Sequence, residues 1–284
     1  MAVTTSSRSG AHVTLVFTVH SDAEDPLEQG SYGVGLCLEA GISTTCRSDP
    51  SPNTGLTVII NGNPSEEELH SAVLSECIEF DSELSSMHHT FDVQSQLPFS
   101  QGFGLSAAGA LSAARCLLAM SSLPAENQDR AAWMIAHRVE RKLSGGLGDV
   151  TALHAGGIAR RNNPGSPYHM VAGNFISGPG QSESWNSPIP VLAVWRKTQS
   201  RHTSEYIDSE KWPILGICVG HQYLATHFGG KAGPAQIPEF GSSLVTLIEE
   251  GWILSGFPKD FNVWESHNDE VHEMPSNFRL MASS

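Results

Sequence analysis

Two glycines stand directly before an alanine-rich segment in the stretch 98–109 (PFSQGFGLSAAG). Because glycine has no side chain, the backbone N–H groups around Gly102 and Gly104 can come close to an anion. If the alanine-rich segment is a helix, the positive end of its dipole favours negative charge at the same place. Ser106 would then contribute a hydroxyl group in the first helical turn. The pattern indicates a loop that binds an anion such as phosphate.

Three interpretations of this loop compete. The simplest is a glycine turn ahead of a packed helix. The second is a dinucleotide-binding fingerprint, because GxGxxA is present and an acid follows at Glu126; Pro98 and the polar residues before it make a poor first strand for that fold. The third is a kinase-type phosphate loop. A Walker loop is excluded, because no Gly-Lys-Ser or Gly-Lys-Thr sequence follows.

A cysteine between two glycines forms a second cluster, in the stretch 212–222 (WPILGICVGHQ). An apolar segment leads into Gly216, Cys218 and Gly220, and such glycines permit the sharp turn that lifts a nucleophile clear of a sheet. A helix beginning behind the turn would favour the thiolate form. The alternative is a buried structural cysteine, and glycines on both sides argue against it. The cluster indicates nucleophilic chemistry at sulfur.

Patterning predicts the elements that must position these groups. Strands are expected at 12–19, 32–38, 56–60 and 87–93, with a tight turn at Asn61-Gly62. Helices are expected at 66–79, 105–120 and 128–143, the last with Asn127 as its N-cap. A buried strand at 214–217 is followed by a helix through His227, and the polar segment 196–210 separates the two parts. The sequence therefore predicts two α/β pieces.

Composition narrows the classes of function. The chain has 39% apolar residues and a net charge of −14, which is typical of a globular protein and disfavours nucleic acid or anionic membrane as a partner. No apolar run approaches the roughly 20 residues of a membrane span, and the N-terminus lacks the apolar core of a signal peptide. The five cysteines include no CxxC pair, so a disulfide framework or zinc site is not predicted. We expect a cytoplasmic protein.

Three sequence blocks, in order, resemble the GHMP kinase superfamily and within it the archaeal pantoate kinases. The blocks are HVT at 12–14 with GSYGVG at 30–35, QGFGLSAAGALS at 101–112, and AHRVE at 136–140 with GLGDV at 146–150. The resemblance implies an enzyme that uses ATP and Mg²⁺ to phosphorylate the hydroxyl group of a small hydroxy acid such as pantoate, on the way to coenzyme A. It also implies an α+β fold of the ribosomal protein S5 domain 2 type.

The same resemblance assigns roles to single residues. Asp149 matches the base that receives the proton of the acceptor hydroxyl, and Ser106 and Glu140 match the metal ligands. The residues matched to the phosphate loop are Gly102, Gly104, Ser106 and Ala107, and those matched to the acceptor site are His12 and Ser31. Taken singly, Ser106 is also compatible with an N-cap, Glu140 with a solvated helix face and Asp149 with a turn.

The C-terminal cluster resembles class I glutamine amidotransferases, specifically the amidotransferase part of GMP synthase. The matching blocks are 213–230, EFG at 239–241 and VWESHNDEV at 263–271. The resemblance implies that Cys218 attacks the side-chain amide of glutamine, that the N–H of Val219 forms half of an oxyanion hole, and that Gln222 contacts the substrate. It also implies that the partner protein is a GMP synthetase subunit.

These resemblances predict the domain organisation. We expect a GHMP kinase-like domain at 1–195 without its C-terminal half, a junction at 196–210, and part of an α/β flavodoxin-like amidotransferase at 211–284, without the histidine base of that family. Three hypotheses follow: a small-molecule kinase, a glutamine-hydrolysing subunit that supplies GMP synthetase, and a chimeric or truncated chain in which neither activity is complete.

Overall fold

The computed structural model describes residues 2–51, 54–66, 68–143, 146–185, 216, 219–251, 254 and 256–283. The chain divides into two compact units, unit 1 at Met1–Pro188 and unit 2 at Ile189–Ser284. The junction predicted at 196–210 lies outside the described residues, as does the strand predicted at 214–217 apart from Gly216. Within the described parts of the chain, no helix is both long and apolar enough to cross a membrane.

Two long antiparallel strands form the centre of unit 1, β1 (Val3–His20) and β2 (Gly30–Pro50). The predicted strands at 12–19 and 32–38 are confirmed, but each extends much further. Many of the additional residues are Ser or Thr, so these stretches lack the apolar alternation that signals a strand. Some of them are nevertheless buried, because small hydroxyl side chains find partners there: Thr44 bonds to Ser112 at 2.7 Å.

Other strands extend the sheet on both sides of β2. The strand order is β4-β3-β5-β2-β6-β9, with β1 also paired to β2, which makes seven strands within the described residues. Their bounds are β3 (Gly55–Ile60), β4 (Asn63–Pro64), β5 (Met87–Ser95), β6 (Ile158–Asn163) and β9 (Gln181–Trp185). The turn predicted at Asn61-Gly62 is confirmed, since both residues adopt positive φ, 50° and 80°. A separate hairpin contains β7 (Tyr168–Val171) and β8 (Asn174–Ser177).

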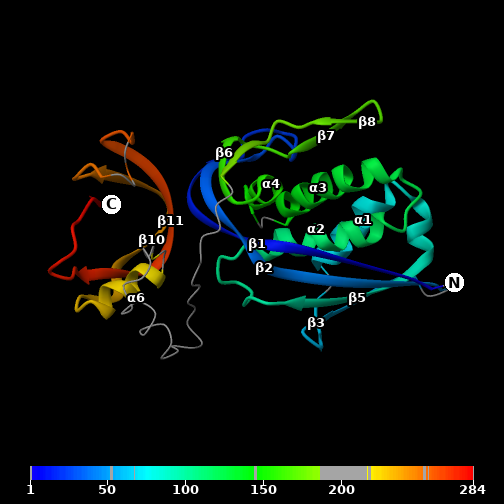
Figure 1. Cartoon of the computed structure of the whole chain (residues 1–284), viewed down its shortest axis with the longest axis horizontal. Helices are drawn as coiled ribbons and strands as arrows, with labels where there is room; N and C mark the ends of the chain where they lie inside the picture. The colour runs from blue at the N-terminus through cyan, green and yellow to red at the C-terminus, as the bar shows by residue number, and fades with distance from the viewer. Residues whose placement is uncertain are drawn as a thin grey trace. The chain divides into compact units, whose positions relative to one another are not determined.

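Helices cover one face of this sheet (Figure 1). They are α1 (Glu68–Ile78), the short 3₁₀ helix η1 (Ser82–Ser86), α2 (Leu105–Leu118), α3 (Ala125–Lys142) and α4 (Asp149–Ala155). The three predicted helices are confirmed, whereas α4 was not predicted. The prediction that Asn127 caps α3 is wrong: Pro124 is the N-cap residue, and the N–H of Asn127 donates to its carbonyl.

The middle helix, α2, is the most deeply buried element. It packs on β1 and β2 on one side and on α1 and α3 on the other. Its alanines allow this close approach, because a small side chain lets neighbouring backbones come near, and Ala107, Ala110 and Ala114 are fully buried. The body of α2, which follows the glycine loop, is therefore packed between the sheet and the other helices.

Unit 2 contains one described helix, α6 (Val219–His227), and a sheet of three described strands. The strands are β10 (Lys231–Leu247), β11 (Asp260–Glu273) and β12 (Ala282–Ser283), in the antiparallel order β11-β10-β12. The predicted helix through His227 is confirmed. The blocks EFG and VWESHNDEV lie on neighbouring strands, since Glu239 is paired with His267.

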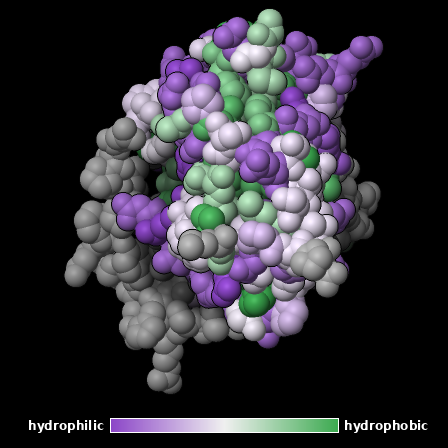
Figure 2. Space-filling view, turned by 90° about the vertical axis from the view of Figure 1, so that its right-hand side faces the viewer, coloured by the Kyte–Doolittle hydropathy of each residue, from purple (hydrophilic) through white to green (hydrophobic). Residues whose placement is uncertain are grey.

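Both polar and apolar residues are exposed at the surface. Figure 2 shows one face of the molecule, on which hydrophobic residues form separate patches between hydrophilic ones. Surface of this kind is normal for a globular protein, because single exposed apolar residues need no partner. Functional chemistry has to be sought at the start of α2, where glycines and carboxylates converge.

Candidate functional site

A loop of unusual backbone conformation leads into α2. Ser100, Gly102 and Gly104 all adopt positive φ, at 56°, 78° and 57°. Gly104 is the N-cap of the helix, which leaves Ser106 as its second residue with an exposed side chain. A Cβ atom at Gly104 would lie 3.1 Å from the carbonyl oxygen of His12 and 3.2 Å from Cγ of Asp149. The left-handed conformation favours glycine at position 104, and the two close neighbours leave little room for a side chain there.

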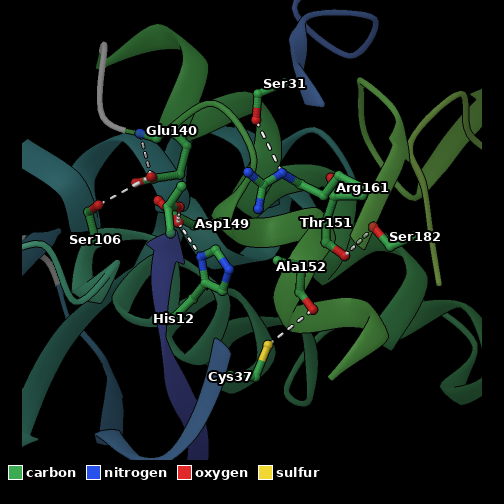
Figure 3. A network of polar contacts seen from close by, with 12 residues as sticks. His12, Ser31, Cys37, Ser106, Glu140, Asp149, Thr151, Ala152, Arg161 and Ser182 are labelled. Atoms are coloured by element: carbon green, nitrogen blue, oxygen red, sulfur yellow. Dashed lines mark hydrogen bonds and ion pairs between the residues drawn. The ribbon is translucent and has the colours of Figure 1, made fainter. Parts of the chain in front are cut away.

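A carboxylate of α3, that of Glu140, lies against the start of α2. Glu140 is only 2% exposed, so the alternative of a solvated helix face is wrong. Its Oε2 accepts hydrogen bonds from Oγ of Ser106 at 3.2 Å and from the N–H of Gly146 at 2.7 Å (Figure 3). Its Oε1 is buried and has no hydrogen-bond partner among the described residues.

A second carboxylate lies beside the first. Asp149 is the first residue of α4 rather than part of a simple turn, and its Oδ1 lies 2.5 Å from Nδ1 of His12 in β1. The hydroxyl of Thr14 donates to the same oxygen at 3.4 Å. A Cβ atom at Gly146 would lie 2.6 Å from both Oδ2 of Asp149 and Oε2 of Glu140. The two carboxylates therefore flank one glycine.

The carboxylate of Asp149 affects the ionisation of Glu140. Burial, together with the negative charge of Asp149, raises the pKa of Glu140 to about 7, against the opposing hydrogen bonds from Ser106 and Gly146. A cation placed here would relieve both effects. A hydroxyl, a carboxylate and an unpartnered carboxylate oxygen are ligands that suit Mg²⁺. No cluster of three or more His, Cys, Asp or Glu able to hold a metal occurs in the described part of the chain, so such an ion would need further ligands from phosphate or water.

One buried cation was missed by the sequence analysis. Arg161 in β6 is 2% exposed, and its Nε donates to Oγ of Ser31 at 3.2 Å. Its guanidinium group points toward Asp149 in Figure 3, and its Nη1 has no partner within the described residues. Burial lowers the pKa of Arg161, and the charge of Asp149 opposes that change. The signal was the pair Arg160-Arg161 in a short strand, since side chains alternate and one of the two must face inward.

Some of the predicted residues of the kinase site line a cavity, and others are buried. Gly102, Gly104, Ser106 and Asp149 line a cavity of about 440 Å³ in unit 1, together with Gly146 and apolar side chains. Ala107 is fully buried and does not line it. Both predicted acceptor-binding residues are buried as well: His12 contacts Asp149 and Ser31 contacts Arg161.

The predicted amidotransferase site lies at the start of α6. Cys218 lies outside the described residues. Val219 is the first residue of α6, a position whose N–H has no acceptor within a helix. A Cβ atom at Gly216 would lie 2.6 Å from Cδ1 of Leu224, so this glycine approaches α6 closely. The side-chain amide of Gln222 donates to the carbonyl oxygen of Asp269 at 2.8 Å and thereby joins α6 to β11.

Two family models match different parts of the chain. The GHMP kinases N-terminal domain matches residues 71–157, which contain α1, α2, α3 and α4. The class I glutamine amidotransferase model matches residues 175–284 and thus begins inside β8 of unit 1. A solved structure described as a phosphotransferase related to the CoA biosynthesis pathway has a similar fold. That structure has a TM-score of 0.54 and 24% identity, covering 75% of this chain and 71% of its own.

Curated relatives match the C-terminal part. The glutamine-hydrolysing GMP synthase subunit of Thermoplasma acidophilum is 48% identical over 80 residues, which is 28% of this chain and 40% of that protein. The corresponding protein of Saccharolobus solfataricus is 52% identical over 79 residues, or 28% and 42%. The chain thus spans about two fifths of the length of these relatives.

Proposed function

We propose that this chain, which joins a GHMP kinase N-terminal domain to a class I glutamine amidotransferase segment, is an ATP-dependent kinase for a small hydroxy acid. The observation that carries the proposal is the convergence of Ser106, Glu140 and Asp149 at the start of α2, from three helices. A glycine loop, two carboxylates and a helix N-terminus at one place fit the needs of phosphoryl transfer.

Each group has a task in that reaction. When bound, ATP with Mg²⁺ supplies the phosphoryl group and neutralises its charge. The loop at Gly102 and Gly104 holds phosphate oxygens by its N–H groups. Ser106 and Glu140 hold the metal, and the unpartnered Oε1 of Glu140 supports this role because a buried carboxylate oxygen needs a partner.

The acceptor side is formed by Asp149 and Arg161. Asp149 takes the proton of the acceptor hydroxyl while that oxygen attacks phosphorus. Arg161 offers an unpartnered Nη1, and a guanidinium group recognises carboxylates well. An acceptor with both a hydroxyl and a carboxylate fits this pair. Pantoate is such an acid, and the likeness of unit 1 to a CoA-pathway phosphotransferase supports the choice.

Acceptor-dependent release of ADP tests the proposal. The full chain is incubated with ATP, Mg²⁺ and one of three acceptors. These are pantoate, the amide of pantoate, and 4-deoxypantoate, which lacks the hydroxyl group that would be phosphorylated. We expect ADP release with pantoate, much less with the amide, which Arg161 binds poorly, and none with the deoxy analogue. Equal release of ADP with all three compounds would contradict the assignment of the acceptor.

A second function is favoured by a specific observation, the 48–52% identity of the C-terminal part to glutamine-hydrolysing subunits of GMP synthase. We propose that Cys218 is a glutamine-reactive nucleophile, that the N–H of Val219 belongs to its oxyanion hole, and that Gln222 lies beside the substrate. The corresponding partner is a GMP synthetase subunit. Co-elution of the purified chain with such a partner in size-exclusion chromatography tests this; separate elution at micromolar concentrations would contradict it.

A further inference from the structure

We propose that His12 and Gly35 form a positioning device for Asp149; this inference rests on the proposed kinase function. His12 is completely buried, so it cannot contact an acceptor from its present position. Its Nδ1 lies 2.5 Å from Oδ1 of Asp149 (Figure 3). The contact joins β1 to the first residue of α4 across 137 residues of sequence.

Gly35 fixes the histidine ring from the opposite side. The Cβ of any side chain at Gly35 would collide with Nε2 of His12, and would lie 2.6 Å from its Cε1. Nε2 is buried and has no hydrogen-bond partner among the described residues. Because Nδ1 is the nitrogen that faces a carboxylate, the neutral ring is assigned the tautomer with its proton on Nδ1.

This arrangement divides the two oxygens of Asp149 between two tasks. Oδ1 accepts from His12 and, at 3.4 Å, from the hydroxyl of Thr14. Oδ2 lies on the side of Gly146 and Glu140, where Asp149 lines the cavity. The carboxylate plane is therefore held so that Oδ2 is presented to the acceptor.

The acceptor hydroxyl gives its proton to Oδ2 as its oxygen forms a bond to the γ-phosphorus of ATP. The bond from that phosphorus to the bridging oxygen breaks, and its electron pair leaves with ADP. His12 gains no proton in this step; its task is orientation. Its backbone N–H also donates to the carbonyl of Phe103 at 3.0 Å, so the same residue ties the base to the phosphate loop.

Substitutions separate orientation from simple packing. His12→Leu removes the donor, whereas His12→Asn places an amide N–H near the position of Nδ1. We expect His12→Leu to lower kcat about 10- to 100-fold, with the acceptor KM and the Kd of a magnesium–ATP analogue each changed less than threefold, and His12→Asn to recover most of the loss. His20→Asn, an exposed histidine of the same strand, is the matched control. Equal kcat for wild type and both His12 variants, or a loss carried by KM alone, would overturn the proposal.

Gly35→Ala gives a second arm, because the added Cβ displaces the ring without removing it. The same Cβ would also lie 2.7 Å from the carbonyl oxygen of Val13, so the variant should lower kcat at least as much as His12→Leu does. A wild-type kcat in folded Gly35→Ala would overturn the proposal.

Histidine ¹⁵N spectra of the folded chain give a readout that needs no turnover. We expect one Nδ1–H tautomer that reverts to the common Nε2–H form in Asp149→Ala and in Gly35→Ala. An Nε2–H tautomer in the wild type would contradict the inference. If the wild type shows the Nδ1–H tautomer but does not bind nucleotide, the kinase function is contradicted instead.

Discussion

The site of unit 1 and the predicted site of unit 2 are built differently. In unit 1, β1, β6 and three helices separated by up to 149 residues of sequence bring polar groups together, including the pair His12–Asp149 and the pair Ser106–Glu140. In unit 2, the predicted residues lie within five positions of one another, at Cys218, Val219 and Gln222. A site of the first kind depends on the packing of the whole unit, whereas one of the second kind depends mainly on a local turn.

This difference also appears in the electrostatics. Unit 1 buries Glu140 and Arg161 and leaves one atom of each without a partner in the described structure. Such groups cost stability unless a ligand completes them. At the predicted site of unit 2, by contrast, Gln222 already has a backbone partner in Asp269. We therefore expect a nucleotide with Mg²⁺, or an acceptor acid, to stabilise the folded protein. We also expect substitutions at residues of unit 1 that are far apart in the sequence to affect the same activity.

The largest expected effect is the complete loss of thiol labelling when Cys218 of unit 2 is replaced. Cys218 should be labelled by a thiol-directed glutamine analogue, and Cys218→Ala should remove the label completely. The same chain should release no glutamate from glutamine above background. The reason is that hydrolysis needs a general base, and none of the four histidines after Cys218 is followed two residues later by glutamate. Mass spectrometry locates the label, and a coupled assay follows glutamate.

Steady glutamate release that disappears in Cys218→Ala would contradict the prediction that the chain does not hydrolyse glutamine. It would direct attention to His267, which lies on β11 with Nε2 3.7 Å from Oε2 of Glu265. His272→Gln is a suitable control, since it changes another histidine of the same strand.

The next largest effect is expected at Asp149. Asp149→Asn keeps the shape of the side chain but cannot take the acceptor proton, so turnover should fall about 10²- to 10⁴-fold. Nucleotide binding should stay within about threefold, because the phosphate loop is unchanged. Rapid-quench measurement of phosphoryl transfer tests the first statement and calorimetry the second. Asp129→Asn, at an exposed position, is the control. An unchanged rate would remove Asp149 from the mechanism.

A third effect follows from the raised pKa of Glu140. Its ordinary value is 4.5 and its value in the fold is about 7, so the stability that this residue contributes is fully present below pH 4.5 and is lost as the pH rises to about 7. Without ligand, Glu140→Gln should gain roughly 3 kcal/mol over wild type between pH 4.5 and 8, as an upper limit. Urea unfolding at several pH values measures this. A constant difference across the range would contradict the assigned ionisation.

The smallest effect is expected at Arg161. Arg161→Lys keeps the charge but loses the planar fork of donors, so the acceptor KM should rise about tenfold, corresponding to loss of one charge-assisted hydrogen bond of about 1.5 kcal/mol. Acceptor-dependent kinetics measure it, with Arg160→Lys, the exposed neighbour in the same strand, as control. An equal rise for both variants would show a general charge effect instead of recognition.

The sequence predicted local features well and long-range ones poorly. The glycine loop and α2 were predictable, because Gly102, Gly104 and the alanines that follow have strong conformational preferences. The extension of β2 was not, since residues such as Thr44 are buried only through partners on another element. Arg161 was missed for the same reason. The contact of His12 with Asp149 required the fold, because no spacing in the sequence indicates a pair 137 residues apart.

Binding of a magnesium–ATP analogue is the most direct test of the central claim that the start of α2 is a nucleotide phosphate site. Isothermal titration of the full chain compares wild type with Ser106→Ala, Glu140→Gln and Gly104→Val, with Ser121→Ala, just beyond the far end of the same helix, as a control. We expect micromolar to millimolar binding that requires Mg²⁺, is weakened at least tenfold by each site variant and is unchanged by the control. Binding that is the same in all of these proteins, or no binding by the folded wild type, would contradict it.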